Sequence, residues 1–173
     1  MRKKSGFRKG LLLIAALILL TIAAFFAAKQ VFPQDYKAEV TAAADRHGLQ
    51  SDFVFAVIWT ESKFNPSAVS KVGAKGLMQL MPDTYEWLCS LRRDDTGDLF
   101  DPAVNIEYGC YNLSLLLERY DFEWVAIAAY NAGRTRVDGW LADGIDKNSI
   151  PFEETRRFVL QVQAVKILYS FLY

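Results

Sequence analysis

The amino-acid sequence predicts a mainly α-helical protein, with one compact domain preceded by a single apolar helix. The chain has 173 residues, which is enough for one domain and a short appendage. Valine, isoleucine and threonine never alternate with polar residues over the length of a strand, so a sheet is at most a minor feature. Most segments instead carry the start and stop signals of helices. We assign residues 1–29 to a basic stub and an apolar helix, and residues 30–173 to the domain.

The N-terminal segment has the length and composition of a membrane-spanning helix. Residues 11–28 form a run of 18 without a charge, which at about 1.5 Å per residue reaches roughly 27 Å, enough for a bilayer core. A cleavable signal usually has an apolar core of about 7 to 15 residues, and no Ala-x-Ala cleavage site follows this run. We therefore favour a retained anchor over a cleaved and secreted form. The five basic residues before Leu11 predict a cytoplasmic stub, with residues 30–173 on the outer face of a cell membrane.

The charge distribution argues against a nucleic-acid partner. Six of the 20 basic residues lie in the first 29 residues, which contain no acid. Residues 30–173 therefore carry 14 basic residues against 20 acidic ones, although the whole chain is formally neutral. Nucleic acids bind basic surfaces, whereas an acidic domain is compatible with a neutral polymer.

Two helices are expected first in the domain. The segment "DYKAEVTAAADRHG" has acids early and basic residues late, and Gly48 ends it. Ser51 can cap a second helix that runs to about Lys63 and stops before the pair Asn65 and Pro66. His47, the single histidine, lies at a helix end. Because no Cys/His cluster has zinc spacing, we predict neither a metal nor a cofactor.

The middle of the chain combines an ordered loop with two helices. Two glycines and a proline punctuate "SAVSKVGAKGLMQLMP", which predicts a loop over residues 67–82. A short helix is expected from Asp83 to about Leu91, followed by the polar loop "RRDDTGD". Asp101 followed by Pro102 is a cap and first-turn signal for a long helix to about Tyr120.

Three helices are predicted in the last third of the chain. The segment "DFEWVAIAAYNAG" ends on Gly133, and "TRVDGWLADG" forms a short helix. Pro151 precedes "FEETRRFVLQVQAVKILYSFLY", whose two acids lie at its start, where the helix macrodipole favours them. The two cysteines, Cys89 and Cys110, fall on neighbouring helices. A disulfide is permitted outside the membrane, but we favour two buried thiols.

One carboxylic acid ends the most apolar segment of the domain, "FVFAVIWTES". In helical geometry Glu61 shares a face with Ile58, Val57 and Val54, which lie three, four and seven residues before it. Burial and the carbonyl end of the helix both disfavour the charged form, so we expect a raised pKa with burial as the larger cause. A carboxyl group that is protonated at neutral pH can donate a proton. The alternative is a glutamate that emerges into solvent at the helix end.

Two further segments have the composition of a ligand cleft. "GAKGLMQLMP" combines glycines that allow close approach of backbone, the amide of Gln79 and the adaptable apolar side chains Met78 and Met81. "AAYNAG" ends an apolar helix with two polar tips, Tyr130 and Asn131. Each segment alone is equally compatible with an ordinary loop or an ordinary helix end.

Taken together, four segments resemble the catalytic domain of the soluble lytic transglycosylase family, relatives of goose-type lysozyme. They are, in order, "ESKFNPSAVSKVGAKGLMQLMP", "DPAVNIEYGCYNL", "AIAAYNAGRTRVDGW" and "IPFEETRRFV". Their order and spacing match over roughly residues 35–173. The resemblance implies a lysozyme-like fold with Glu61 as the catalytic acid, and peptidoglycan glycan strands as the substrate. The residues that match the family's saccharide cleft are Ser62, Ser70, Gln79, Met81, Tyr130, Asn131 and Glu154.

The resemblance implies a lyase that cleaves the bond between N-acetylmuramic acid and N-acetylglucosamine and leaves 1,6-anhydro ends. Glu61 would first act as an acid and then as a base. Glycosidases that use water need a second carboxylate, and the best remaining one is Glu154, at a helix start. A hydrolytic muramidase on the same fold is the alternative. A murein-binding protein without catalytic activity is less favoured because Glu61 is present. No motif in the sequence indicates a protein partner.

Overall fold

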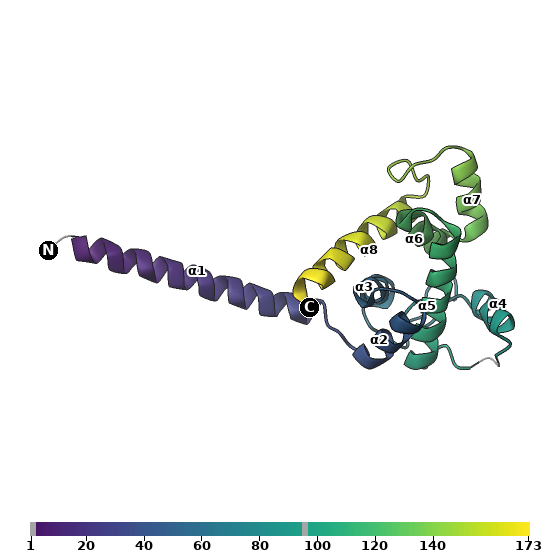
Figure 1. Cartoon of the computed structure of the whole chain (residues 1–173), viewed down its shortest axis with the longest axis horizontal. Coiled ribbons are helices and arrows are strands. Elements are labelled where there is room, and N and C mark those ends of the chain that lie inside the picture. The colour runs from purple at the N-terminus through teal and green to yellow at the C-terminus, as the bar shows by residue number, and fades with distance from the viewer. Residues whose placement is uncertain (1–2, 95–96) are drawn as a thin grey trace. The chain divides into compact units, whose positions relative to one another are not determined.

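The computed structural model describes residues 3–94 and 97–173 and consists of helices joined by loops (Figure 1). Residues 1–2 of the basic stub and residues 95–96 of the predicted polar loop lie outside the described residues. The chain divides into two compact units. The first comprises Met1–Pro33 together with Leu172–Tyr173, and the second comprises Gln34–Phe171.

The first unit is dominated by one helix, α1 (Lys3–Val31). Its segment Gly10–Val31 is long and apolar enough to cross a membrane, and none of that segment is buried by the rest of the chain. The segment is four residues longer than the uncharged run in the sequence, because it also takes in Gly10 and the three residues after Ala28. Its length and composition suit a spanning helix or a signal sequence.

The second unit contains the helices that the sequence predicts, each with bounds within about two residues of expectation. They are α2 (Lys37–Arg46), α3 (Ser51–Ser62), α4 (Pro82–Arg92), α5 (Pro102–Arg119), α6 (Glu123–Ala132), α7 (Arg134–Ala142) and α8 (Glu153–Leu172). The mainly α-helical fold class is thereby confirmed, and among the described residues the only β-structure is a pair of isolated bridges.

The helix ends show which local signals act as predicted. Asp101 caps α5, where its carboxylate accepts a hydrogen bond from the Val104 amide at 3.0 Å. Gly133 ends α6 with a φ of 86°, a conformation that favours glycine. The prediction that Ser51 caps α3 is wrong, because Ser51 is already helical and Gln50 occupies the cap position without a side-chain hydrogen bond.

Helix α3 lies at the centre of the core and positions its last turn. Its residues Phe53–Ile58 are all at most 2% exposed. On one side the helix packs against α2, and on another the ring of Phe55 stacks on Tyr169 of α8, with centroids 5.4 Å apart. A helix that is apolar all round is stable only when other elements cover it. The covered helix ends at Glu61 and Ser62, where the chain reaches the surface.

The loop after α3 is ordered by short backbone bridges and one buried side chain. Lys75 pairs with both Val69 and Leu80 in isolated antiparallel bridges. Asn105 of α5 is fully buried; its carboxamide oxygen accepts from the Met78 amide at 2.7 Å, and its nitrogen donates to the carbonyls of Lys75 (2.9 Å) and Leu99 (2.8 Å). A Cβ at Gly76 would lie 2.2 Å from the Asn105 nitrogen, so this position requires glycine.

Replacing this asparagine, Asn105→Ala, is expected to destabilise the fold by about 3 kcal/mol, because the Met78 amide and the Leu99 carbonyl lose their buried partner and the Lys75 carbonyl keeps only its bond from the Leu80 amide. Thermal unfolding of the full chain in one detergent measures the loss. The matched control is Asn148→Ala, since Asn148 is an exposed asparagine in the loop before α8. An unchanged unfolding temperature for Asn105→Ala would show that the loop does not depend on this side chain.

The two cysteines are free and buried, Cys89 on α4 and Cys110 on α5. The preference for two buried thiols is therefore confirmed. Burial in apolar surroundings raises the pKa of the Cys110 thiol well above its usual range, so this group is a packing residue and not a nucleophile.

Candidate active site

The Glu61 carboxyl lies in the last turn of α3, above the buried residues Val54, Val57 and Ile58. The residue keeps some contact with solvent, but the apolar atoms around its carboxyl raise the pKa of Glu61 to about 8. A smaller contribution comes from the negative charge of Glu154. The predicted direction and main cause are confirmed, and the charge of Glu154 is a second cause that the sequence did not indicate. Glu61 is therefore protonated over most of the neutral range.

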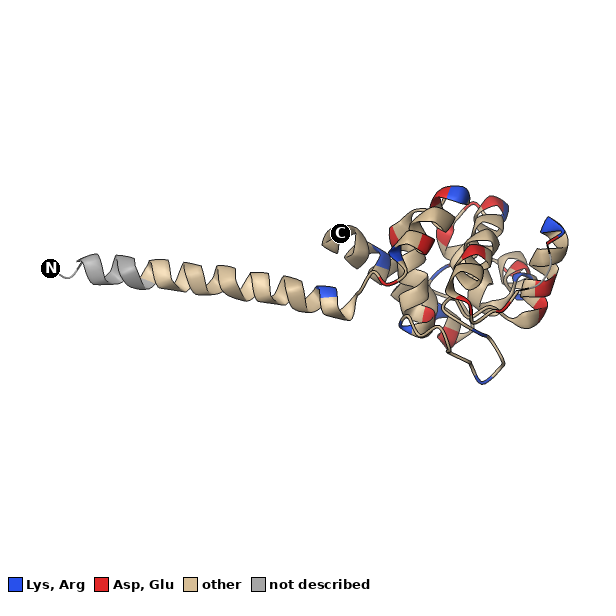
Figure 2. Cartoon of the chain, turned by 90° about the horizontal axis from the view of Figure 1, so that it is seen from below, with Lys and Arg blue, Asp and Glu red and all other residues tan. Residues whose placement is uncertain are grey.

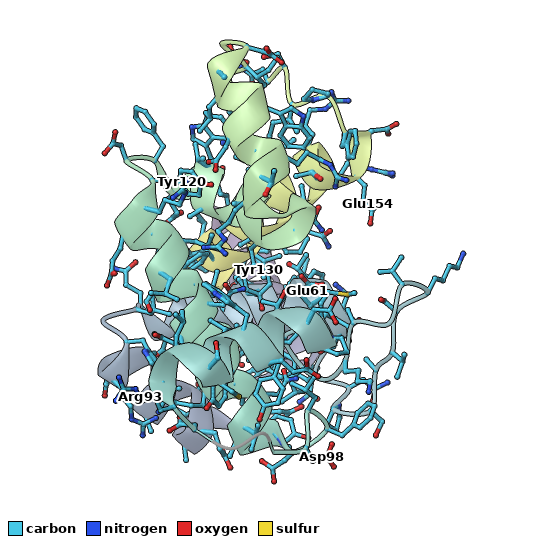
Figure 3. All side chains as sticks on the ribbon, turned by 90° about the vertical axis from the view of Figure 1, so that its right-hand side faces the viewer. Glu61, Arg93, Asp98, Tyr120, Tyr130 and Glu154 are labelled. Atoms are coloured by element: carbon cyan, nitrogen blue, oxygen red, sulfur yellow. The ribbon has the colours of Figure 1, made fainter. Side chains whose placement is uncertain are left out.

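Tyr130 lies next to this acid (Figure 3). It belongs to the last turn of α6, and its hydroxyl donates a hydrogen bond to the Met78 carbonyl at 2.8 Å. Burial raises the pKa of Tyr130 well above its usual value, and the Glu61 charge adds to the effect. The phenol is thus a neutral group that joins the end of α6 to the loop 63–81. Met78 itself fits because Gly109 of α5 has no Cβ, which would lie 2.2 Å from the methionine sulfur.

The loop 63–81 contains three of the predicted site residues. The Ser70 hydroxyl accepts from the Ala74 amide at 3.0 Å. The amide nitrogen of Gln79 donates to the carbonyls of Ala68 (3.1 Å) and Gly76 (2.8 Å), so both of its N–H donors brace the loop. Gln79 also has a φ of 50°, which is uncommon for a residue other than glycine. Met81 is exposed at the start of α4 and offers an apolar surface.

A hydrogen bond joins the remaining predicted residues across two helices. The Asn131 carboxamide oxygen accepts from the hydroxyl of Thr155, a buried residue of α8, at 2.8 Å. This bond fixes the first turn of α8 against the end of α6. Glu154, the residue before Thr155, is exposed and lies at the start of α8, where Figure 3 labels it. The Asn131–Thr155 bond therefore holds a second carboxylate within electrostatic range of Glu61.

The Ser62 side chain forms a hydrogen bond within its own helix. Its hydroxyl donates back to the Ile58 carbonyl of its own helix at 3.2 Å, so it is a helix-end residue in this structure. Two residues that sequence reasoning missed support the site: Asn105 and Thr155. Met78, which the sequence singled out for its side chain, contributes its backbone carbonyl and amide instead. All three lie inside the segments that carry the family resemblance, but nothing in a local pattern marks a side chain that braces a distant backbone.

Two pockets help to locate the accessible surface. The larger, about 520 Å³, lies between α2 and α5 beside Arg46 and Glu107. Arg46 and Arg92 form ion pairs with that glutamate, and His47 hydrogen-bonds to it. These charged side chains are paired with one another, so we do not place the catalytic site there. A smaller pocket of about 260 Å³ borders Tyr130 and is lined by Asp83, Trp87 and Arg134. Its lining residues come from α4, α5, α6 and α7 and do not include Glu61.

No metal site is apparent in residues 3–94 and 97–173, where no group of three or more His, Cys, Asp or Glu side chains could hold an ion. His47 instead pairs with Glu107, with 3.0 Å between Nε2 and Oε1. The titratable groups that the structure places at the described site are a carboxyl with a raised pKa, a phenol with a raised pKa and an exposed carboxylate.

Comparisons with known families, curated proteins and solved structures all identify the same family. The family model "Transglycosylase SLT domain" matches residues 39–151. A protein of Haemophilus influenzae named "putative soluble lytic murein transglycosylase" is 36% identical over 151 residues, covering 81% of this chain and 26% of that protein. The chain thus spans about a quarter of the length of the curated relatives it matches.

Solved structures show the same fold. The 70 kDa soluble lytic transglycosylase of Escherichia coli superposes with a TM-score of 0.77 at 31% identity, covering 83% of this chain and 25% of that one. An inactive mutant of the lytic transglycosylase Slt of Pseudomonas aeruginosa, in which glutamine replaces a glutamate, superposes with a TM-score of 0.75 at 36% identity. It covers 81% of this chain and 24% of that one. The lysozyme-like fold class expected from the sequence is confirmed.

Proposed function

The chain belongs to the transglycosylase SLT domain family, and we propose that it is a lytic murein transglycosylase with Glu61 as its single catalytic acid and base. The substrate is the glycan strand of peptidoglycan. The bond cleaved is the β-1,4 link from N-acetylmuramic acid to N-acetylglucosamine, and the product carries a 1,6-anhydro-muramyl end.

The observation that carries this proposal is the raised pKa of Glu61, about 8. At neutral pH the carboxyl holds a proton that it can give to the glycosidic oxygen as the C1–O bond breaks. In the relative from Pseudomonas aeruginosa, a glutamate-to-glutamine mutant is described as inactive, which supports an essential glutamate in a protein of this fold.

The second half of the reaction needs no water. The oxygen of the substrate's own N-acetyl group shields the developing charge at C1. Glu61, now ionised, takes the proton from the 6-hydroxyl of the muramic acid, and O6 forms the new bond to C1. One C–O bond breaks, one forms, and Glu61 ends with the proton it had at the start. Because the same residue must lose and regain a proton, a pKa near neutrality suits both steps.

We propose that the residues around Glu61 bind the saccharide. Tyr130 holds the loop and offers its phenol near the acid, and the exposed Met81 provides an apolar surface for a sugar ring. The other residues assigned to the cleft are Ser62, Ser70, Gln79, Asn131 and Glu154. We further propose that α1 is retained and anchors the protein to the outer face of a bacterial cell membrane. N-terminal sequencing of the mature protein tests retention, because a cleaved form lacks the basic stub before Leu11.

A hydrolytic muramidase is the second candidate, and the Glu154 carboxylate favours it. Two carboxylates that act on one glycosidic bond are the usual arrangement of enzymes that use water. The charge of Glu154 acts on the Glu61 carboxyl, so a second acid is electrostatically coupled to the first.

Mass spectrometry of digested sacculi separates the two candidates. A transglycosylase leaves anhydro ends, whereas a muramidase leaves reducing ends that are heavier by one water. We expect anhydro ends only. Reducing ends as the primary product would replace the proposal by the hydrolytic one, and intact sacculi would refute both.

The pH dependence of cleavage gives an independent prediction. Rates should fall as the pH rises through about 8, because Glu61 loses its proton. The substitution Glu154→Gln removes a negative charge that raises the pKa of Glu61, so the alkaline limb should move to lower pH. The matched control is Glu153→Gln, since Glu153 is an exposed neighbour that pairs with Arg157 at 3.7 Å. If both variants have the same alkaline limb as the wild type, Glu154 does not act on the acid.

A further inference from the structure

Helix α8 has an exposed apolar face in addition to its buried one. Its buried residues, Phe158, Val162, Val165 and Tyr169, pack into the core. On the opposite side lies a set that we call the outer stripe: Leu160, Ala164, Ile167, Leu168 and Phe171. Steps of four, three, one and three residues place these side chains along one face of a helix. A helix that is apolar on two faces is typical of one covered on both.

The outer stripe is large, exposed and uncharged. Ile167 is 68% exposed and Phe171 is 77% exposed. Lys166 is the single charged residue after Arg157, and it is paired with Glu123 of α6 at 2.7 Å. The last turn of α8, next to the C-terminal label in Figure 2, contains no charged residue. Contiguous apolar surface of this kind marks a site of contact with another molecule or with lipid.

The chain itself indicates what covers the stripe. Leu172 and Tyr173 follow it directly and belong to the same compact unit as α1. In that unit the Tyr173 hydroxyl donates to the Phe32 carbonyl at 2.9 Å, and the Lys29 ammonium lies 4.2 Å from the centre of the Tyr173 ring. Tyrosine and lysine at the end of a spanning helix are typical of the headgroup level of a membrane. Only Leu172, the last residue of α8, lies between Phe171 and Tyr173 in the chain.

We propose that the outer stripe of α8 binds the surface of the same membrane that α1 spans, with Ile167, Leu168 and Phe171 inserted among the lipid headgroups. The occupant is lipid, because the stripe has apolar and aromatic side chains and no charge for a polar partner, and because the chain continues from Phe171 into the unit that contains α1. An apolar helix face of this kind inserts about 5–10 Å into the interface. The inference rests on the proposed retention of α1. This contact gives the second unit, Gln34–Phe171, an attachment to the membrane in addition to its covalent link to α1.

The test uses the full chain, one copy per lipid nanodisc, with a single new cysteine that carries an environment-sensitive fluorophore. Ile167→Cys and Phe171→Cys report on the stripe. Val72→Cys is the matched control, because Val72 is an exposed apolar residue of the loop 63–81 at 76% exposure. Cys89 and Cys110 are buried and do not label in the folded protein. We expect blue-shifted emission at positions 167 and 171 that brominated lipids quench, and water-like, unquenched emission at position 72.

Two outcomes would overturn the proposal. Emission at positions 167 and 171 that matches position 72 would show that the stripe is in water. Blue-shifted emission that brominated lipids do not quench would show that protein covers the stripe instead of lipid. Murein takes no part in this measurement, and cleavage by the same labelled proteins is assayed separately. If the labelled proteins cleave murein but the fluorophores at positions 167 and 171 are not quenched, this inference is contradicted and the proposed function is not.

Discussion

The substitution Glu61→Gln is expected to lower the rate of murein cleavage by about 10³-fold or more, because it removes the proton donor and leaves an amide of nearly the same shape. Both steps of the proposed reaction use this one group, so no other described residue can replace it in either. Anhydro ends released from purified sacculi, counted by mass spectrometry, measure the effect.

The matched control for this loss is Glu118→Gln. Glu118 is an exposed glutamate near the end of α5, and its replacement should leave the rate unchanged. A Glu61→Gln protein that is folded and still releases anhydro ends at a rate close to the wild type would remove Glu61 from the mechanism. The proposal of a transglycosylase would then need another acid.

The same substitution should stabilise the fold at neutral pH. An ordinary glutamate has a pKa of 4.5, whereas that of Glu61 in the folded protein is about 8. Between these values the unfolded chain has released the proton and the folded chain retains it, so wild-type stability falls as the pH rises from about 4.5 to about 8. Each pKa unit corresponds to about 1.4 kcal/mol, and partial exposure of the side chain reduces the effect. We expect Glu61→Gln to be more stable by about 2 kcal/mol at pH 7.

Unfolding temperatures measured from pH 4 to pH 8 in one detergent test this expectation. The two proteins should converge near pH 4, where the wild-type carboxyl is protonated in both states, and diverge as the pH rises. Glu118→Gln should follow the wild type throughout. A constant difference between Glu61→Gln and the wild type at all pH values would mean that the Glu61 carboxyl is not desolvated in the folded protein.

Much of the fold could be predicted because its determinants are local. Asp101 and Pro102 begin α5, and Gly133 ends α6, since each acts through backbone groups only a few residues away. The predicted capping residue of α3 is wrong. Ser51 is a good capping residue in isolation, but the chain enters the helix one residue earlier, at Gln50. Boundaries of this kind depend on how the whole helix packs.

The site was predictable to the extent that burial follows from a helical pattern. The apolar face of α3 identified Glu61 and the direction of its pKa. The supporting contacts join residues far apart in the sequence, such as Asn105 with Met78 and Thr155 with Asn131, and no local signal reports them. The use of Gln79 to brace its own loop, and the exposure of one apolar face of α8, likewise depend on the packed structure.

The account depends on Glu61 keeping its proton in an apolar setting, and a direct titration of that side chain tests it. The carboxyl carbon of Glu61 can be followed by nuclear magnetic resonance in protein labelled with ¹³C-glutamate, with its signal assigned by its absence from Glu61→Gln. We predict a midpoint at about 8. A midpoint near 4.5, the value of an ordinary glutamate, would mean that the group is charged at neutral pH and cannot be the proton donor.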